Sequence, residues 1–141
     1  MSSTVYREFN ILVIEDELPL QDAIRIKLEN NGLKVITARS VKQALSYVEE
    51  VATIDVIWLD HYLLGQENGL EFVARLKNEK SRYRDIPIFV VSNSVGQDKI
   101  TSYINFGINK YYTKTEFTLA EIVTDIKEYV TSTTSESVPQ T

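Results

Sequence analysis

The sequence predicts an α/β fold: a doubly wound, five-stranded parallel sheet with helices on both faces. Five short apolar runs alternate with longer segments of helical spacing, which is the pattern of repeated strand–helix units. Several of these runs are continuous rather than alternating, as expected for strands buried on both faces of a parallel sheet. The 141 residues fit one domain, which is large enough to form a core without disulfides.

The expected strands are short and rich in Val, Ile and aromatic residues. They cover residues 11–14, 34–38, 56–59, 88–91 and 111–113. The segment after the first strand predicts a helix, because Leu20, Ile24 and Leu28 lie four residues apart and Asn31-Gly32 supplies a stop.

The remaining helices follow from apolar spacing and from N-terminal capping signals. Ser40 with Gln43, and Thr118 with Glu121, have the spacing of capping boxes at the starts of the second and fifth helices. Two further helices are expected over residues 69–77 and 98–106. The polar stretch from residue 131 has no periodicity, so we expect a disordered tail over 132–141. The folded domain is expected over 9–131, after an N-terminal extension over 1–8.

Composition excludes several classes of protein. A net charge of −5 and a pI near 4.9 argue against direct binding to nucleic acid or to an anionic membrane. Without cysteine, and with one histidine, the chain has no disulfide framework, zinc–thiolate site or His-rich metal site. The sequence shows neither a signal-peptide pattern nor an apolar run of about 20 residues, so we expect a cytoplasmic protein.

Polar side chains collect where the expected strands end. Acidic residues, Glu15 and Asp16 among them, follow the first strand, and Asp60 ends the third. Ser92 ends the fourth, and Lys114 follows the fifth. Because ligand sites of doubly wound sheets lie at the carboxyl ends of the strands, we expect these side chains to form one site.

This residue set predicts phosphate and metal chemistry. Clustered carboxylates form a hard-oxygen site for Mg²⁺, which also relieves their mutual repulsion. An Asp beside the metal can act as a nucleophile towards phosphorus, while the metal and a lysine neutralise the transferring oxygens. Taken singly, each residue has an ordinary explanation: Asp16 as a helix cap, Asp60 as a loop acid, Ser92 as a strand-end hydroxyl and Lys114 as surface.

Four segments resemble response-regulator receiver domains over residues 9 to about 131: ILVIEDE, DVIWLD, IPIFVVSN and FGINKYYTK. The resemblance implies a sheet of order 2-1-3-4-5, as in flavodoxin-like folds. It implies that Asp60 accepts a phosphoryl group from a sensor histidine kinase or phosphotransfer protein. Asp16, Asp60 and the backbone carbonyl of Tyr62 would bind Mg²⁺, with Glu15 reaching the metal through water. Ser92 and Lys114 would bind the phosphoryl group.

The resemblance also implies how the signal leaves the domain. Ser92 and Tyr111 correspond to the family's switch pair, and a downstream protein target would read a face that includes Tyr103, Ile104, Tyr111 and Tyr112. Core packing is the other explanation for these aromatic residues. We expect a stand-alone, single-domain regulator, with a phosphorylation-dependent dimer as one form of output. Tyr62 is expected to cover the acyl phosphate and to slow its hydrolysis.

The sequence departs from the family pattern in two places. Leu64 stands where the family has proline, and Gly69 comes one residue later than the family's glycine. The sequence therefore does not predict the path of the loop after Asp60. Thr115 follows the lysine in place of the usual proline, which leaves the geometry of that peptide bond open because a cis bond before a non-proline residue costs about 2.5–4 kcal/mol. It is also open whether Phe117 takes the place of the family's phenylalanine.

Three other classes of protein have related folds. A phosphatase of the haloacid dehalogenase type has a second Asp where Tyr62 stands here, and carries a cap or insert for which this chain has no room. A flavodoxin-type carrier needs phosphate donors in the first loop, where Glu15 and Asp16 would repel the anion. A pseudo-receiver scaffold shares the fold without phosphorylation, and the intact Asp60 and Lys114 argue against it.

Overall fold

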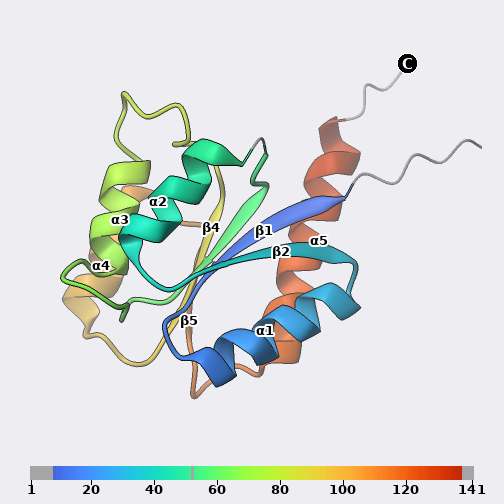
Figure 1. Cartoon of the computed structure of the whole chain (residues 1–141), viewed down its shortest axis with the longest axis horizontal. Coiled ribbons are helices and arrows are strands. Elements are labelled where there is room, and N and C mark those ends of the chain that lie inside the picture. The colour runs from blue at the N-terminus through green and yellow to red at the C-terminus, as the bar shows by residue number, and fades with distance from the viewer. Residues whose placement is uncertain (1–7, 52, 138–141) are drawn as a thin grey trace, which may run out of the picture.

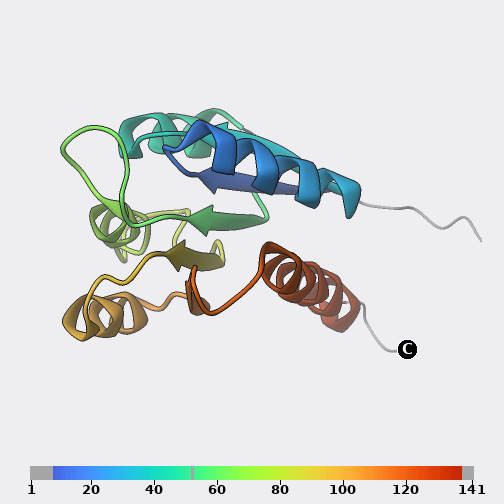
Figure 2. The same cartoon turned by 90° about the horizontal axis from the view of Figure 1, so that it is seen from below.

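A computed structural model describes residues 8–51 and 53–137 of the chain, with side chains described as far as residue 132. Its five strands are β1 (Phe9–Ile14), β2 (Leu33–Ala38), β3 (Val56–Leu59), β4 (Ile88–Ser92) and β5 (Lys110–Thr113). They form one parallel sheet in the order β2-β1-β3-β4-β5, which confirms the predicted fold class and strand order. In Figure 2 the arrowheads of β1, β3 and β4 point the same way.

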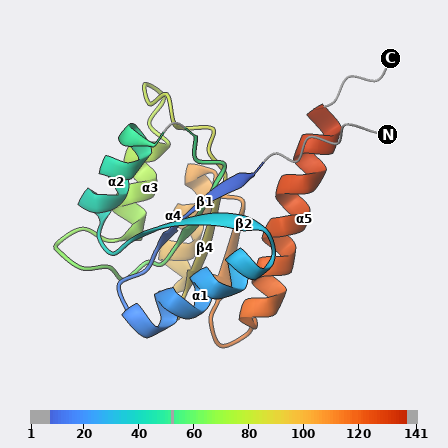
Figure 3. The ribbon, with the colours of Figure 1, turned by 45° about the vertical axis from the view of Figure 1, so that its right-hand side comes forward.

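Five helices connect and cover the strands. They are α1 (Leu18–Asn30), α2 (Val41–Glu50), α3 (Gly69–Leu76), α4 (Gln97–Phe106) and α5 (Leu119–Ser137). Helices α1 and α5 lie on one face of the sheet, and α2, α3 and α4 lie on the other (Figures 1 and 3). Each face therefore has its own apolar cluster, and the inner strands β1, β3 and β4 contribute alternate side chains to both.

Both predicted capping signals are present, with one difference. Thr118 and Glu121 form a reciprocal box, since each backbone N–H donates to the other's side chain at 2.9 and 3.1 Å. The Ser40 hydroxyl accepts from the Gln43 N–H at 3.1 Å, but the Gln43 side chain accepts from the N–H of Arg39, one residue before the cap. A third box, between Asn68 and Glu71, starts α3.

The last helix is longer than predicted. Helix α5 continues through Ser137, into the segment expected as a tail, while residues 138–141 lie outside the described part. Apolar periodicity follows the buried stripe of the helix, and Val130 is the last buried apolar residue among the side chains that the structure describes. A helix can continue past that stripe on backbone hydrogen bonds alone, and these leave no apolar pattern in the sequence.

The loop after β3 has a defined path despite its unusual sequence. The Leu64 N–H donates to the Arg39 carbonyl at 3.1 Å, which makes an isolated bridge to the segment after β2, and Gly65 supplies a positive φ of +88°. A Cβ on Gly69 would lie 2.7 Å from both the Asp60 carbonyl oxygen and the Tyr103 hydroxyl. Gly69 is therefore required for α3 to approach the end of β3. No peptide bond in the described residues is cis, so the Lys114–Thr115 bond is trans.

Candidate functional site

The parallel register brings the predicted polar residues to one edge of the sheet. Ile14 of β1 lies beside Leu59 of β3, so Glu15 and Asp60, which follow them, emerge side by side. Ser92, at the end of β4, is the register partner of Thr113, and Lys114 comes next. Backbone bonds continue past the strands: the Asp60 N–H donates to the Ile14 carbonyl at 2.9 Å and the Lys114 N–H donates to the Ser92 carbonyl at 2.8 Å.

Three carboxylates form the acidic part of this site. One oxygen from each of Glu15, Asp16 and Asp60 lies within 4.8 Å of the other two. Glu15 and Asp60 are buried and Asp16 is half-buried. Three hard oxygen donors at this spacing suit a small divalent cation, so the residues fit the Mg²⁺ that the sequence led us to expect.

Lys114 supplies the positive charge beside these acids. Its ammonium donates to Glu15 Oε1 at 3.0 Å and to Asp60 Oδ2 at 2.9 Å. Burial alone would lower the pKa of Lys114, but the hydrogen bonds and charges of Asp60 and Glu15 outweigh it and raise the pKa. The side chain therefore stays a cation across the physiological range.

Hydrogen-bond donors also surround the second oxygen of Asp60. The Ser92 hydroxyl donates to Asp60 Oδ1 at 2.6 Å, and the backbone N–H of Tyr62 donates to the same oxygen at 3.3 Å. Both carboxylate oxygens of Asp60 are thus held by donors suited to an anion. The geometry leaves the carboxylate fixed at the base of the site.

Glu15 is the acid of the cluster whose pKa is raised. Burial, followed by repulsion from Asp60, raises the pKa of Glu15 from 4.5 to about 7, although the Glu17 N–H at 3.1 Å and Lys114 oppose the shift. Burial and repulsion from Asp60 thus outweigh the stabilisation that Lys114 gives to the ionised Glu15. A divalent cation would remove this deficit.

His61 and Tyr103 form a buried polar contact directly behind the site. The His61 Nδ1 and the Tyr103 hydroxyl are 2.5 Å apart, and both side chains are almost completely buried. Burial, and then the charge of Lys99, lowers the pKa of His61, so the imidazole is neutral at pH 7. The contact joins the residue after Asp60 to α4.

The aromatic residues expected to form the output face divide into two groups. Tyr103 and Tyr112 are fully buried, so their prediction as surface readout residues is wrong. Tyr103 points beneath α4 towards His61, and Tyr112 reaches from β5 to α5, where its hydroxyl donates to Asp125 at 2.8 Å. Ile104 is 59% exposed, and Tyr111 is half-buried with its hydroxyl donating to the Asn93 carbonyl at 2.9 Å.

Tyr62 extends across the opening next to Asp60. The residue is 50% exposed, and its hydroxyl donates to the Ser94 carbonyl at 3.3 Å. The side chain thereby spans from the loop after β3 to the loop after β4. Phe117 packs edge-on against Tyr112, with ring centroids 5.0 Å apart.

Two supporting residues were missed from the sequence. Arg39 donates through Nε and Nη2 to the backbone carbonyl of Asp16 at 3.0 and 2.8 Å, which fixes the loop that carries the acids. Gln21 donates to the Glu15 carbonyl at 2.9 Å from within α1. Both bonds end on backbone carbonyls, 23 residues away for Arg39 and six for Gln21, and neither spacing belongs to a recognised sequence motif.

Fold and site together define a doubly wound α/β protein with a carboxylate, hydroxyl and lysine cluster at its switch point. Residues 11–127 match the family model described as the response regulator receiver domain, and the chain belongs to that family. It is a receiver domain of two-component signalling, a class of phosphoacceptor signalling domains rather than classical enzymes.

Individual relatives agree with this assignment. The phosphate regulon transcriptional regulatory protein PhoB of Escherichia coli is 33% identical over 117 residues, which cover 83% of this chain and 49% of PhoB. The chain therefore spans about half the length of that relative. The phosphorylated cyanobacterial phytochrome response regulator RcpA is 28% identical, with a TM-score of 0.79 over 90% of this chain and 96% of RcpA. A CheY-like receiver from Methanospirillum hungatei, at 18% identity and a TM-score of 0.81, covers 93% of this chain and 100% of its own and shares the fold.

Proposed function

We propose that this protein is a Mg²⁺-dependent switch in which Asp60 accepts a phosphoryl group from a histidine kinase or phosphotransfer protein. The observation that carries the proposal is the position of Asp60. Its carboxylate is buried, lies within reach of Glu15 and Asp16, and is hydrogen-bonded by both Ser92 and Lys114.

The proposed reaction is a substitution at phosphorus. A carboxylate oxygen of Asp60 attacks the phosphorus atom, the bond from phosphorus to the donor's imidazole nitrogen or leaving oxygen breaks, and an acyl phosphate forms. The ammonium of Lys114 is already on the Asp60 side of the site, so it can follow the negative charge onto the new phosphoryl oxygens.

Glu15, Asp16, Asp60 and the backbone carbonyl of Tyr62 would hold the metal ion. When bound, Mg²⁺ would neutralise phosphoryl oxygens and offset the repulsion between the acids. The raised pKa of Glu15 supports this requirement, because burial and, after it, repulsion from Asp60 both disfavour the ionised carboxylate, and a cation would offset both.

The switch follows from the limited donor capacity of Ser92. A hydroxyl carries one hydrogen, which Ser92 now donates to Asp60 Oδ1. To bind a phosphoryl oxygen it must leave that acceptor, and the end of β4 moves with it. Tyr111 contacts the adjoining Asn93 carbonyl, so this movement reaches the face formed by α4 and β5. Phosphorylation would shift an existing equilibrium between two conformations, and a partner protein would prefer one of them.

The surface available to such a partner is apolar and belongs to α4. Ile104 is 59% exposed and Phe106 is 41% exposed, in contrast to Tyr103, which precedes Ile104 and is buried. Either a downstream protein or a second copy of this chain would find its apolar contacts there.

No helix in the described residues is long and apolar enough to cross a membrane.

Intact-mass measurement tests the proposal. Incubation with Mg²⁺ and acetyl phosphate should add one phosphoryl group to the wild type and none to Asp60→Asn, because an amide cannot attack as a carboxylate does. Asp98→Asn, at the exposed start of α4, is a matched control that should react normally. Failure of the wild type to gain mass would support a pseudo-receiver scaffold instead.

A further inference from the structure

Two backbone N–H groups of the segment after β3 face the acceptor side of the site. The Tyr62 N–H donates to Asp60 Oδ1 at 3.3 Å, and the His61 N–H donates to the Ser92 hydroxyl oxygen at 3.4 Å. Both distances exceed the usual range of about 2.7–3.2 Å, so neither N–H is fully used by its present acceptor. An anion bound beside Asp60 would give both donors a stronger partner.

The direction of these donors depends on how His61 is held. The His61 carbonyl accepts from the Gly69 N–H at 2.8 Å, which ties the segment to the start of α3. The imidazole Nδ1 lies 2.5 Å from the Tyr103 hydroxyl, and the two rings meet edge-on with centroids 5.7 Å apart. The residue that carries one of the N–H donors is therefore fixed on its other side by α4.

The polar character of this contact is costly unless it serves orientation. His61 and Tyr103 are 2% and 0% exposed, and Tyr103 lies in the apolar cluster beneath α2, α3 and α4. Two apolar side chains could fill the same space without burying an imidazole and a hydroxyl. A buried hydrogen bond adds what apolar packing lacks, because it allows only a narrow range of ring orientations.

We propose that Tyr103 is a positioning residue for the phosphorylation of Asp60. By binding the imidazole of His61 it fixes the segment after β3, so that the N–H groups of His61 and Tyr62 face the oxygens of the incoming phosphoryl group. The inference rests on the proposed function and adds α4 to the parts of the chain that set the reaction rate.

The rate of phosphorylation by acetyl phosphate tests this role. Intact-mass time courses at saturating Mg²⁺ and several acetyl phosphate concentrations give a maximum rate and a half-saturating concentration. Tyr103→Phe should lower the maximum rate about tenfold, less than the roughly hundredfold loss that follows when such a donor is removed outright. The half-saturating concentration and the Mg²⁺ affinity should stay near the wild-type values, because the carboxylates and Lys114 are untouched.

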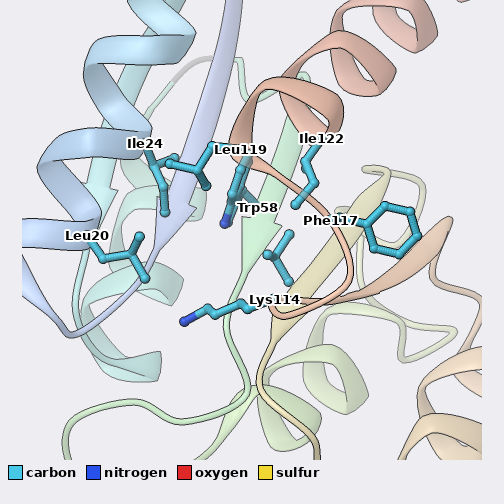
Figure 4. Close-up of a pocket in the computed structure, with 8 residues that line it drawn as sticks. Leu20, Ile24, Trp58, Lys114, Phe117, Leu119 and Ile122 are labelled. Atoms are coloured by element: carbon cyan, nitrogen blue, oxygen red, sulfur yellow. The ribbon is translucent and has the colours of Figure 1, made fainter.

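Tyr112→Phe is the matched control for a general loss of stability. It also removes a buried tyrosine hydroxyl that has a hydrogen-bond partner, Asp125, but it does so in the apolar cluster on the opposite face of the sheet. Figure 4 shows side chains of that cluster, Trp58 and Ile122 among them, between α1 and α5. Tyr112→Phe should keep the wild-type maximum rate.

Variants of His61 identify the contact itself. His61→Asn keeps a hydrogen-bonding atom at the same number of bonds from Cβ as Nδ1 and should retain most of the rate, whereas His61→Leu should be as slow as Tyr103→Phe. The double variant His61→Leu/Tyr103→Phe should be no slower than either single variant, because each removes the same interaction.

The outcomes separate this inference from the proposed function. Equal maximum rates for the wild type and Tyr103→Phe, or the same slowing in Tyr112→Phe as in Tyr103→Phe, would overturn the positioning role and leave the proposed function standing. A wild type that gains no phosphoryl group would overturn both.

Discussion

Glu15 should make the metal-free protein less stable as the pH rises. Its pKa in the folded state is about 7, against an ordinary value of 4.5, because it is buried and faces Asp60. The folded state therefore binds the proton more tightly than the unfolded state does. Below pH 4.5 both states are protonated and Glu15 costs nothing; stability is lost as the pH rises from 4.5 to about 7, and the full cost persists above that.

The size of the effect follows from the same values. Each pKa unit between the two states corresponds to about 1.4 kcal/mol, so ionised Glu15 costs on the order of 3 kcal/mol in the metal-free protein. Glu15→Gln mimics the protonated form and should escape this cost. The variant should match the wild type near pH 4.5 and exceed its free energy of unfolding by up to this amount at pH 7.5.

Urea unfolding at a series of pH values, in EDTA, measures the difference directly. Glu17→Gln, an exposed acid on the same loop, is the control and should show no such pH-dependent gain. Saturating Mg²⁺ should remove the advantage of Glu15→Gln, because the cation offsets the charge. A stability difference between Glu15→Gln and the wild type that is constant from pH 4.5 to 7.5 would refute the electrostatic reasoning.

Three further predictions concern neighbouring side chains. Asp16→Asn should weaken Mg²⁺ binding about tenfold or more by removing a charged ligand; an unchanged titration would exclude Asp16 as a ligand. Tyr62→Asn should shorten the half-life of phospho-Asp60 several-fold with little change in Mg²⁺ affinity, because the ring that reaches Ser94 would no longer cover the acyl phosphate; phosphate-release rates that are equal, or slower in the variant, would remove the shielding role. Tyr103→Phe should lower the free energy of unfolding by about 1–3 kcal/mol, since it leaves the buried His61 without its partner; an unchanged urea midpoint would contradict that contact.

The sequence predicted the fold well because burial in a parallel sheet leaves a direct pattern. The continuous run at residues 56–59 is fully buried, and the stop at Asn31-Gly32 ends α1 where Gly32 takes a φ of +85°. The cluster of Glu15, Asp60, Ser92 and Lys114 was also predictable, because strand ends of a parallel sheet meet at one edge.

What the sequence could not show depends on side-chain direction and on contacts distant in the chain. Tyr103 and Ile104 are adjacent on α4, yet one is fully buried and the other is 59% exposed, and the weak periodicity of that helix did not separate them. His61 was discounted because a single histidine forms no metal site, although its partner is a tyrosine hydroxyl from α4.

Chemical mapping of the phosphorylated residue tests the central claim most directly. After incubation with Mg²⁺ and acetyl phosphate, borohydride reduces an aspartyl phosphate to homoserine, and peptide mass spectrometry locates the change. We predict reduction at Asp60 and at no other carboxylate, and none when EDTA replaces Mg²⁺. Reduction at Asp16 or Glu15 with Asp60 intact would contradict the assignment of Asp60 as the phosphoacceptor.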